Sequence, residues 1–217
     1  MSKREKSKIM REELTFRDAE PRDAHIAAPL IFDTFPKVAT FIVGLGSDEL
    51  AHTILERLFE LPGHRLSYEE TTMAVYQGRV IGLLLSYPAH RMRKLDRKAD
   101  RLILKQYRLR GKLALAIRAW PQLFMNQTNL DEYQIGNLAV RKRYWGRGVG
   151  THLVNYAGEL ARNEGLNRLA LRVAIENQKA RELYERLGFT TDAIYLESNK
   201  RVAHTGAGYR RMVKVLS

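Results

Sequence analysis

The spacing of apolar residues along the chain alternates between the periods of helices and strands, and turn or capping residues mark most of the changes. Helical spacing predicts helices over 21–32, between Ser47 and Pro62, within 90–120, from the glycines at 146–150 to Gly165, and from Asn177 to Gly188. Strand patterns predict strands over 14–17, 71–76, 80–87, 133–140, 168–175, 190–197 and 208–215. Such a chain is expected to form one mixed α/β domain.

Polar residues and glycines indicate where two of these helices begin or end, and where two strands are joined by a turn. Ser47 precedes two acidic residues, the usual arrangement at a helix N-terminus. Asn177 is a plausible cap for the last long helix, and Gly188 is expected at its end in a left-handed conformation. Gln77 and Gly78 predict a tight turn between the strands at 71–76 and 80–87.

The segment from His90 to Trp120 is a helical insertion between two strands. Spacings of four and three residues predict an amphipathic helix with a basic outer face and a break at Gly111. The residues at this spacing are Leu95, Ala99, Leu102, Gln106, Leu109 and Leu113. The four leucines among them form an apolar stripe that would pack on the parent domain or on a second subunit of a homodimer.

A basic, glycine-rich loop joins the strand at 133–140 to the next helix. Its glycines let backbone N–H groups approach an anion closely, and the following helix start adds unsatisfied donors and a positive dipole end. The glycines are Gly146, Gly148 and Gly150, and the nearby cations are Arg141, Lys142, Arg143 and Arg147. This composition predicts a pyrophosphate site.

Two common phosphate loops do not fit this segment. A Walker loop requires a lysine before its hydroxyl residue, whereas Thr151 follows Gly150 directly. A dinucleotide-binding fold favours an acidic residue about 20 positions beyond its glycines, and 166–175 contain none.

The order of strand, glycine loop, helix and strand, followed by the motif from Asn177 through Tyr184 to Gly188 and Phe189, resembles the Gcn5-related N-acetyltransferase (GNAT) family. The resemblance covers about 14–215 except the insertion at about 90–125. It implies a mostly antiparallel, twisted central sheet that is flanked by helices and splayed into a V at its central parallel strand pair. It also implies acetyl transfer from acetyl-CoA to a primary amine of a small molecule or protein, without a metal.

The resemblance assigns roles to individual positions. The backbone of Leu138, Ala139 and Val140 would pair with the pantetheine amides, and Asn177 would line that channel. Tyr184 would protonate the leaving thiolate, although its spacing also suits a core residue. The pyrophosphate would lie on Trp145, Gly146, Arg147, Gly148, Val149, Gly150 and Thr151. Trp145 departs from the family pattern, which usually has Gln or Arg there.

The resemblance leaves the general base unassigned. Gln134 and Arg172 occupy the positions where a glutamate would be sought, and neither can accept the proton. Glu132 is one candidate, and the others are Glu69, Glu70, Glu176 and His204.

Two segments carry the formal net charge of +13. The tail at 1–11 contributes +4 and 90–118 contributes +9, so the rest of the chain is neutral. This suggests an alternative function in which the tail (1–13) and the insertion dock on RNA, the ribosome or an acidic protein, with the CoA site secondary. With the basic tail at 1–13 set apart, the expected domain is a single one that covers 14–217.

The absence of cysteine and the short apolar runs indicate the cellular compartment in which the protein is expected. The absence of cysteine excludes disulfides, thiolate metal sites and a cysteine nucleophile, and fits a reducing compartment. The longest apolar run, near 80–85, is far shorter than the roughly 20 residues of a membrane helix. A soluble cytoplasmic protein without a membrane partner is expected.

Overall fold

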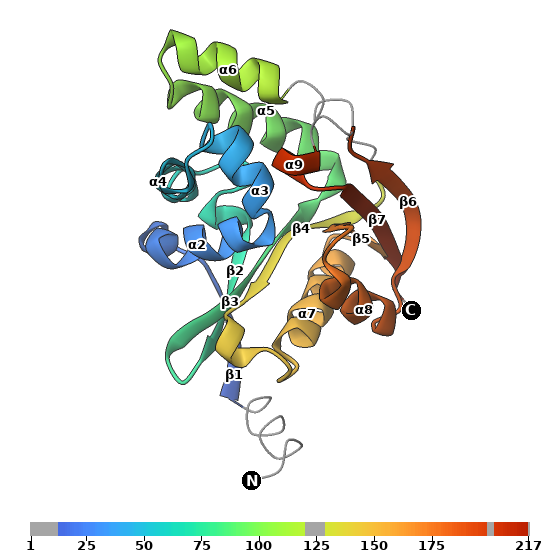
Figure 1. Cartoon of the computed structure of the whole chain (residues 1–217). Helices are drawn as coiled ribbons and strands as arrows, with labels where there is room; N and C mark the ends of the chain where they lie inside the picture. The colour runs from blue at the N-terminus through green and yellow to red at the C-terminus, as the bar shows by residue number, and fades with distance from the viewer. Residues whose placement is uncertain (1–12, 120–128, 199–201, 217) are drawn as a thin grey trace.

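The computed structural model describes residues 13–119, 129–198 and 202–216. Most of the basic tail and part of the insertion therefore lie outside the described residues. Within them the strands form one seven-stranded sheet in the order β1-β2-β3-β4-β5-β7-β6 (Figure 1). The strands are β1 (Leu14–Asp18), β2 (Thr71–Tyr76), β3 (Arg79–Pro88), β4 (Tyr133–Val140), β5 (Arg168–Ala174), β6 (Thr190–Leu196) and β7 (Gly208–Val215).

The pairing of β4 with β5 is parallel, and every other neighbouring pair in this sheet is antiparallel. The parallel ladder joins Tyr133 to Leu169 and ends where Ile135 meets Leu171. Beyond that point β4 continues along β3 while β5 continues along β7, so the two central strands separate. The predicted fold class, a mostly antiparallel sheet splayed at its parallel pair, is confirmed.

Helices cover both faces of the sheet, because alternate residues of the central strands are apolar on both sides. Leu83 of β3 lies in one core and Leu84 lies in the other, and both are fully buried. The first face carries η1 (Pro21–Asp23), α2 (Ala24–Thr34), α3 (Pro36–Val38), the π-helix η2 (Ala39–Val43) and α4 (Asp48–Phe59). The second carries α7 (Val149–Asn163) and α8 (Gln178–Arg186), opposite α2 and α4 in Figure 1.

In the described part of the chain, no single helix is long and apolar enough to cross a membrane. The segments Pro21–Thr34 and Pro36–Val43 reach that length and composition only as a pair bent by 104°. Several of their apolar residues are buried in the first core.

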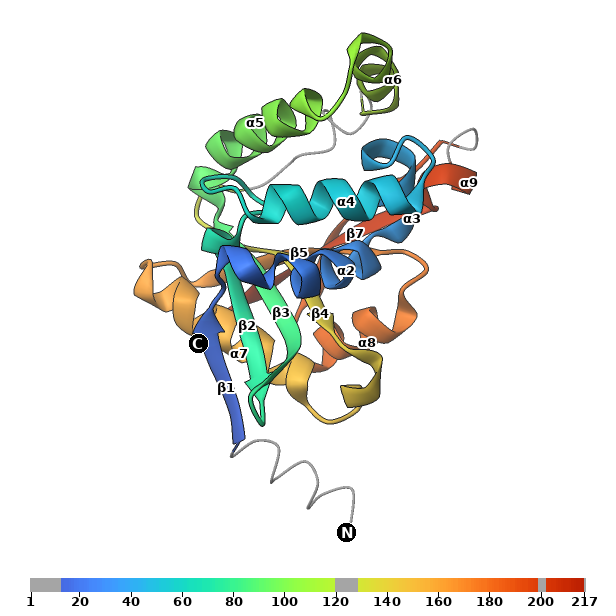
Figure 2. The same cartoon turned by 90° about the vertical axis from the view of Figure 1, so that its left-hand side faces the viewer.

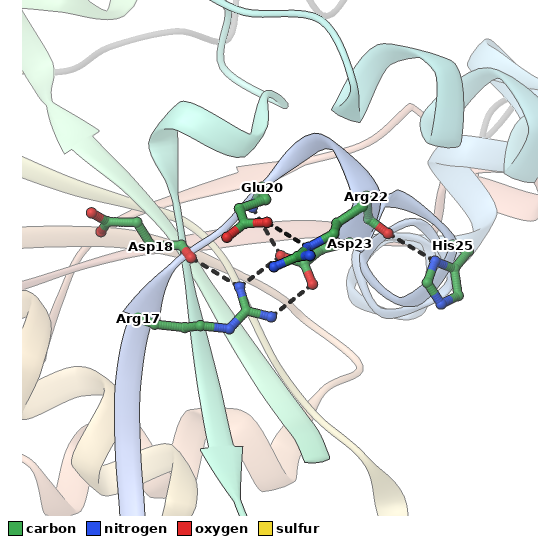
Figure 3. A network of polar contacts seen from close by, with 6 residues as sticks. All are labelled: Arg17, Asp18, Glu20, Arg22, Asp23 and His25. Carbon is green, nitrogen blue, oxygen red and sulfur yellow. Dashed lines mark hydrogen bonds and ion pairs between the residues drawn. The ribbon is translucent and has the colours of Figure 1, made fainter. Parts of the chain in front are cut away.

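An ion pair fixes the connection from β1 into the first helices (Figure 3). Arg17 donates two hydrogen bonds of 2.7 Å to the carboxylate of Asp23, which also accepts the N–H of Glu20 at 2.8 Å. The hydrogen bonds from Arg17 are the main cause that lowers the pKa of Asp23, against the effect of burial. Asp23 thus stays ionised and holds the start of α2 against the end of β1.

The insertion forms two helices, α5 (Ala89–Lys105) and α6 (Leu109–Ala119), at the same end of the molecule in both views (Figures 1 and 2). The predicted break at Gly111 is wrong, since Gly111 lies inside α6 and the chain turns at 106–108. Within the turn, the hydroxyl of Tyr107 donates a hydrogen bond to the carbonyl of Val43. A contact between residues far apart in the sequence, Tyr107 and Val43, thus accompanies the turn between α5 and α6.

Because of the turn, the predicted apolar stripe does not continue from α5 onto α6. Leu95 and Ala99 are buried as predicted, but Leu109 and Leu113 are 83% and 64% exposed, and Leu115 is buried instead. The stripe therefore packs on the parent domain only along α5. The outer face of α5 carries exposed cations, among them Arg93, Arg97 and Arg101, and their docking on an acidic partner stays a prediction.

Candidate functional site

The central feature of the site is the open edge of β4 beyond Ile135. A bulge opposite Leu85 and Ser86 leaves Gly136 as the extra residue of β4, and Gly136 is exposed at the point where β4 leaves β5. The backbone of Leu138, Ala139 and Val140 continues along β3 with no β5 partner in the described sheet. Sequence reasoning did not single out Gly136, although an isolated glycine in a strand pattern signals a bulge.

The bulge also redirects the next side chain. Ile135 lies in the second core, whereas Asn137 donates from its amide nitrogen to the hydroxyl of Thr34, 2.6 Å away on the first face. The simple two-residue alternation would have placed both on the same face. The end of α2 is thereby tied to β4 beside the splay.

The glycine loop turns directly into α7. Gly146 and Gly148 have φ of 71° and 86°, a conformation that disfavours side-chain-bearing residues. Gly148 is the N-cap residue and offers no side-chain acceptor to the first N–H groups of α7, at Val149, Gly150 and Thr151. These donors and the positive end of the 15-residue helix suit an anionic pyrophosphate.

Aromatic residues organise the cations around this loop. The guanidinium carbons of Arg143 and Arg147 lie 4.9 and 5.5 Å from the ring centroid of Tyr144. The indole N–H of Trp145 donates to the carbonyl of Val140 over 2.6 Å, and the ammonium of Lys179 is 5.8 Å from the indole centroid. The residue that departs from the family pattern therefore braces the loop between the end of β4 and the start of α8.

The helix α8 lies beside the loop. A Cβ built on Gly150 would come within 3.1 Å of Leu183, so the two helices pack closely there. Asn177 caps α8 by accepting the N–H of Ala180 at 3.1 Å, and Gly188 ends it with φ of 87°. Both helix-end predictions are confirmed, as is the cap at Ser47.

Tyr184 is the buried residue of α8 and packs in the second core, with its ring 5.6 Å from that of Phe189. Burial raises the pKa of Tyr184 to about 12. No charge or hydrogen bond from the described residues contributes to this shift. The phenol therefore retains its proton throughout the neutral pH range.

Three of the five candidate bases are engaged elsewhere. Glu132 is fully buried just before β4, at the closed end of the V, and is paired with Arg211 and with Arg168 at 3.7 Å. Glu69 accepts the N–H of Gly63, and Glu70 pairs with Arg91. The position of Glu132 argues against its prediction as the base, because both of its carboxylate oxygens are engaged by arginines and it has no exposed surface that an acceptor could reach.

We expect Glu132→Gln to lower the free energy of unfolding by about 3 kcal/mol, because it leaves the buried Arg211 with Asp192 as its remaining ion-pair partner. Urea denaturation measures this loss, and Glu159→Gln on the exposed side of α7 is the control, with a change within about 0.5 kcal/mol. A Glu132→Gln protein of normal stability but with lost turnover would restore Glu132 as the base.

The other two candidates lie near a pocket of about 420 Å³ between η2 and α9 (Val202–Thr205). Aromatic and charged residues line it, including Phe32, Lys37, Phe41, Asp48 and His204. Glu176 directly precedes Asn177 in the chain and reaches the pocket residue Lys37. It pairs with Lys37 at 4.0 Å and accepts the N–H of Ala207 at 2.7 Å, and this backbone bond is the main cause that lowers the pKa of Glu176.

The remaining predicted positions have other surroundings. Gln134 is buried in β4, and the guanidinium of Arg172 lies 5.3 Å from the ring centroid of Tyr209. In the described residues no group of three or more His, Asp or Glu side chains could hold a metal ion.

Comparisons with known proteins point to one family. Residues 45–189 match the model of the "Acetyltransferase (GNAT) family". A putative [ribosomal protein bS18]-alanine N-acetyltransferase of Bacillus subtilis is 34% identical over 30% of this chain and 43% of its own length. N-alpha-acetyltransferase 30 of Schizosaccharomyces pombe is 37% identical over 29% of this chain and 41% of its own.

Both alignments thus span less than half of the curated relatives. Among solved structures, an N-acetyltransferase from Staphylococcus aureus aligns with a TM-score of 0.68 at 19% identity, over 92% of this chain and 99% of that one. This likeness concerns the fold.

Proposed function

Because the chain belongs to the acetyltransferase (GNAT) family, we propose that it transfers an acetyl group from acetyl-CoA to a primary amine by direct attack on the thioester. One observation carries the proposal: β4 leaves β5 at Ile135 and then runs directly into the glycine loop that begins α7. This arrangement supports a cosubstrate that lies along the open strand edge and ends at the start of α7.

Acetyl-CoA would follow that line. Its pyrophosphate would lie on the loop from Trp145 to Thr151, and its pantetheine amides would pair with the edge of β4 at 138–140 that β5 leaves open, beside the Val140 carbonyl that accepts the indole N–H of Trp145. The thioester would then lie near Gly136, where backbone N–H groups of the splayed strand can stabilise the oxyanion of the tetrahedral intermediate.

The departing thiolate needs a proton, and Tyr184 would supply it. A phenol whose pKa is about 12 remains protonated in the free enzyme. The raised pKa weakens its tendency to give up the proton, so the transfer depends on a thiolate close enough to accept it. The position of Tyr184 on α8 beside the loop supports this role.

The pocket between η2 and α9 is the proposed acceptor site. Its volume suits a small organic group, and Asn137 ties the neighbouring α2 to β4 beside the splay. Of the predicted bases, His204 lines the pocket, whereas Glu176 is a weaker base because of its lowered pKa. We assign to His204 acceptance of the proton that the acceptor ammonium loses before its neutral amine attacks the thioester, directly or through water.

We further propose that the acceptor is the α-amine of a peptide. The two curated relatives are named for acetylation of an alanine of a ribosomal protein and for N-alpha-acetylation. The pocket combines aromatic walls with Lys37 and Asp48, which suits the first residues of a peptide, with their side chains and backbone polar groups.

A panel of three amines tests the acceptor class. CoA thiol release is measured with a tetrapeptide amide bearing a free N-terminal alanine, with an α-acetylated peptide containing one lysine, and with spermidine. We expect the first to give the highest kcat/KM. A preference for the lysine peptide or for spermidine would overturn the α-amine assignment, and absence of release with all three would count against amine acetylation.

A further inference from the structure

The acceptor pocket has one wall with an unusual backbone. The π-helix η2 spans five residues, with Ala39, Ile42 and Val43 buried and Phe41 facing the pocket. Its turns close when the N–H groups of Gly44 and Gly46 donate to the carbonyls of Ala39 and Thr40, each over 2.8 Å. π-helical turns are rare and often occur at functional sites. The contacts that hold this wall in place therefore bear on the function of the pocket.

Two residues of the insertion donate hydrogen bonds to backbone carbonyls of η2. Arg118 of α6 donates to the carbonyl of Phe41 over 2.9 Å, and Tyr107 donates from its hydroxyl to the carbonyl of Val43. The guanidinium carbon of Arg118 also lies 4.7 Å from the centroid of the Phe41 ring. A helix pair inserted between β3 and β4 thus holds both the backbone and the side chain of the pocket wall.

Phe41 extends this contact across the pocket. Its ring stacks on the imidazole of His204 with centroids 4.7 Å apart and an angle of 13° between the planes. His204 comes from α9, between β6 and β7. Three segments far apart in sequence therefore meet in a chain of contacts from Arg118 through Phe41 to His204.

From this chain of contacts we infer that Arg118 is a positioning residue for the acceptor pocket. It fixes the ring of Phe41, and through that ring it sets the orientation of His204. The inference rests on the proposed function for its effect on catalysis, because His204 is the proposed base there. It assigns the insertion a role in acceptor binding, separate from the glycine loop and its ligand.

The first test needs no ligand. The ring protons of His204 in the wild-type protein should show an NMR shift caused by the stacked Phe41 ring, with the signals assigned by loss in His204→Asn. Arg118→Met keeps most of the stem but removes the guanidinium, and should move these signals toward their positions in Phe41→Leu. Arg97→Met removes an exposed cation of α5 in the same insertion and should leave them unchanged.

The second test uses the tetrapeptide amide with a free N-terminal alanine. Arg118→Met should raise the KM for this peptide about tenfold, the scale of a lost charged hydrogen bond and cation–π contact, with the KM for acetyl-CoA unchanged. Arg118→Lys should restore little, because an ammonium cannot reproduce the stacked planar guanidinium. Arg97→Met should match the wild type in both KM values.

Unchanged His204 signals and unchanged peptide KM in a folded Arg118→Met protein would overturn the inference. If that variant does not fold, Arg118→Lys keeps a cation but loses the planar guanidinium stacked on Phe41, and unmoved His204 signals there would overturn the inference equally. If the peptide is not acetylated by the wild type, the proposed α-amine acceptor fails, while the NMR comparison still decides the role of Arg118.

Discussion

Tyr184→Phe is expected to lower the rate of acetyl transfer by about 100-fold or more, the usual contribution of a general acid. The phenylalanine ring preserves the packing in the second core beside Phe189. Acetyl-CoA affinity should therefore stay within about twofold. Single-turnover CoA release, which isolates the chemical step, is the appropriate measurement.

The pH dependence of the acetyl-transfer rate also bears on the role of Tyr184. Because burial raises the pKa of Tyr184 to about 12, loss of its proton does not lower the rate between pH 7 and pH 10. Tyr156→Phe is the matched control, since burial also raises the pKa of Tyr156 but its ring packs on Phe16 of β1. Equal single-turnover rates for Tyr184→Phe and Tyr156→Phe would remove Tyr184 from the mechanism.

Gly146→Val is expected to weaken acetyl-CoA binding about 30-fold, or roughly 2 kcal/mol. A β-branched residue does not tolerate φ of 71°, so the loop must turn away from the conformation that presents its N–H groups. A Cβ at this position would meet no protein atom within 4 Å, so the side chain would project into the space in front of the loop. Calorimetric titration with acetyl-CoA measures the change.

Gly165→Val is a close control for this substitution. Gly165 follows the other end of α7, also has φ of 71°, and would also place its Cβ in open space. Both variants should lose similar stability from backbone strain, and only Gly146→Val should lose affinity. A similar loss of affinity in both would show that general destabilisation is responsible and that the loop does not hold the cosubstrate.

Local patterns predicted the parts of this molecule that local physics determines. β4 begins and ends at Tyr133 and Val140 as its alternation indicates, and Asn177 caps α8 as its position before that helix suggests. The glycine loop could be recognised because left-handed glycines and cations lie next to one another in the chain. Those features need only neighbours in sequence.

The features that were not predicted depend on contacts between distant segments. The turn at Tyr107 forms where its hydroxyl reaches Val43, 64 positions away, and no breaker residue marks it. Glu132 was a candidate base by residue type, and its ion pair with Arg211 of β7 joins positions 79 residues apart. The pocket brings Phe41 and His204 together from opposite ends of the chain. Periodicity contains no information about such pairs.

The central claim is that the loop before α7 and the open edge of β4 bind acetyl-CoA. Calorimetric titration of acetyl-CoA into the wild-type protein tests it most directly, with Gly146→Val and Gly165→Val titrated in parallel. We predict saturable one-to-one binding to the wild type and to Gly165→Val, and about 30-fold weaker binding to Gly146→Val. No measurable binding to the wild type, or equal affinity in all three proteins, would contradict the claim.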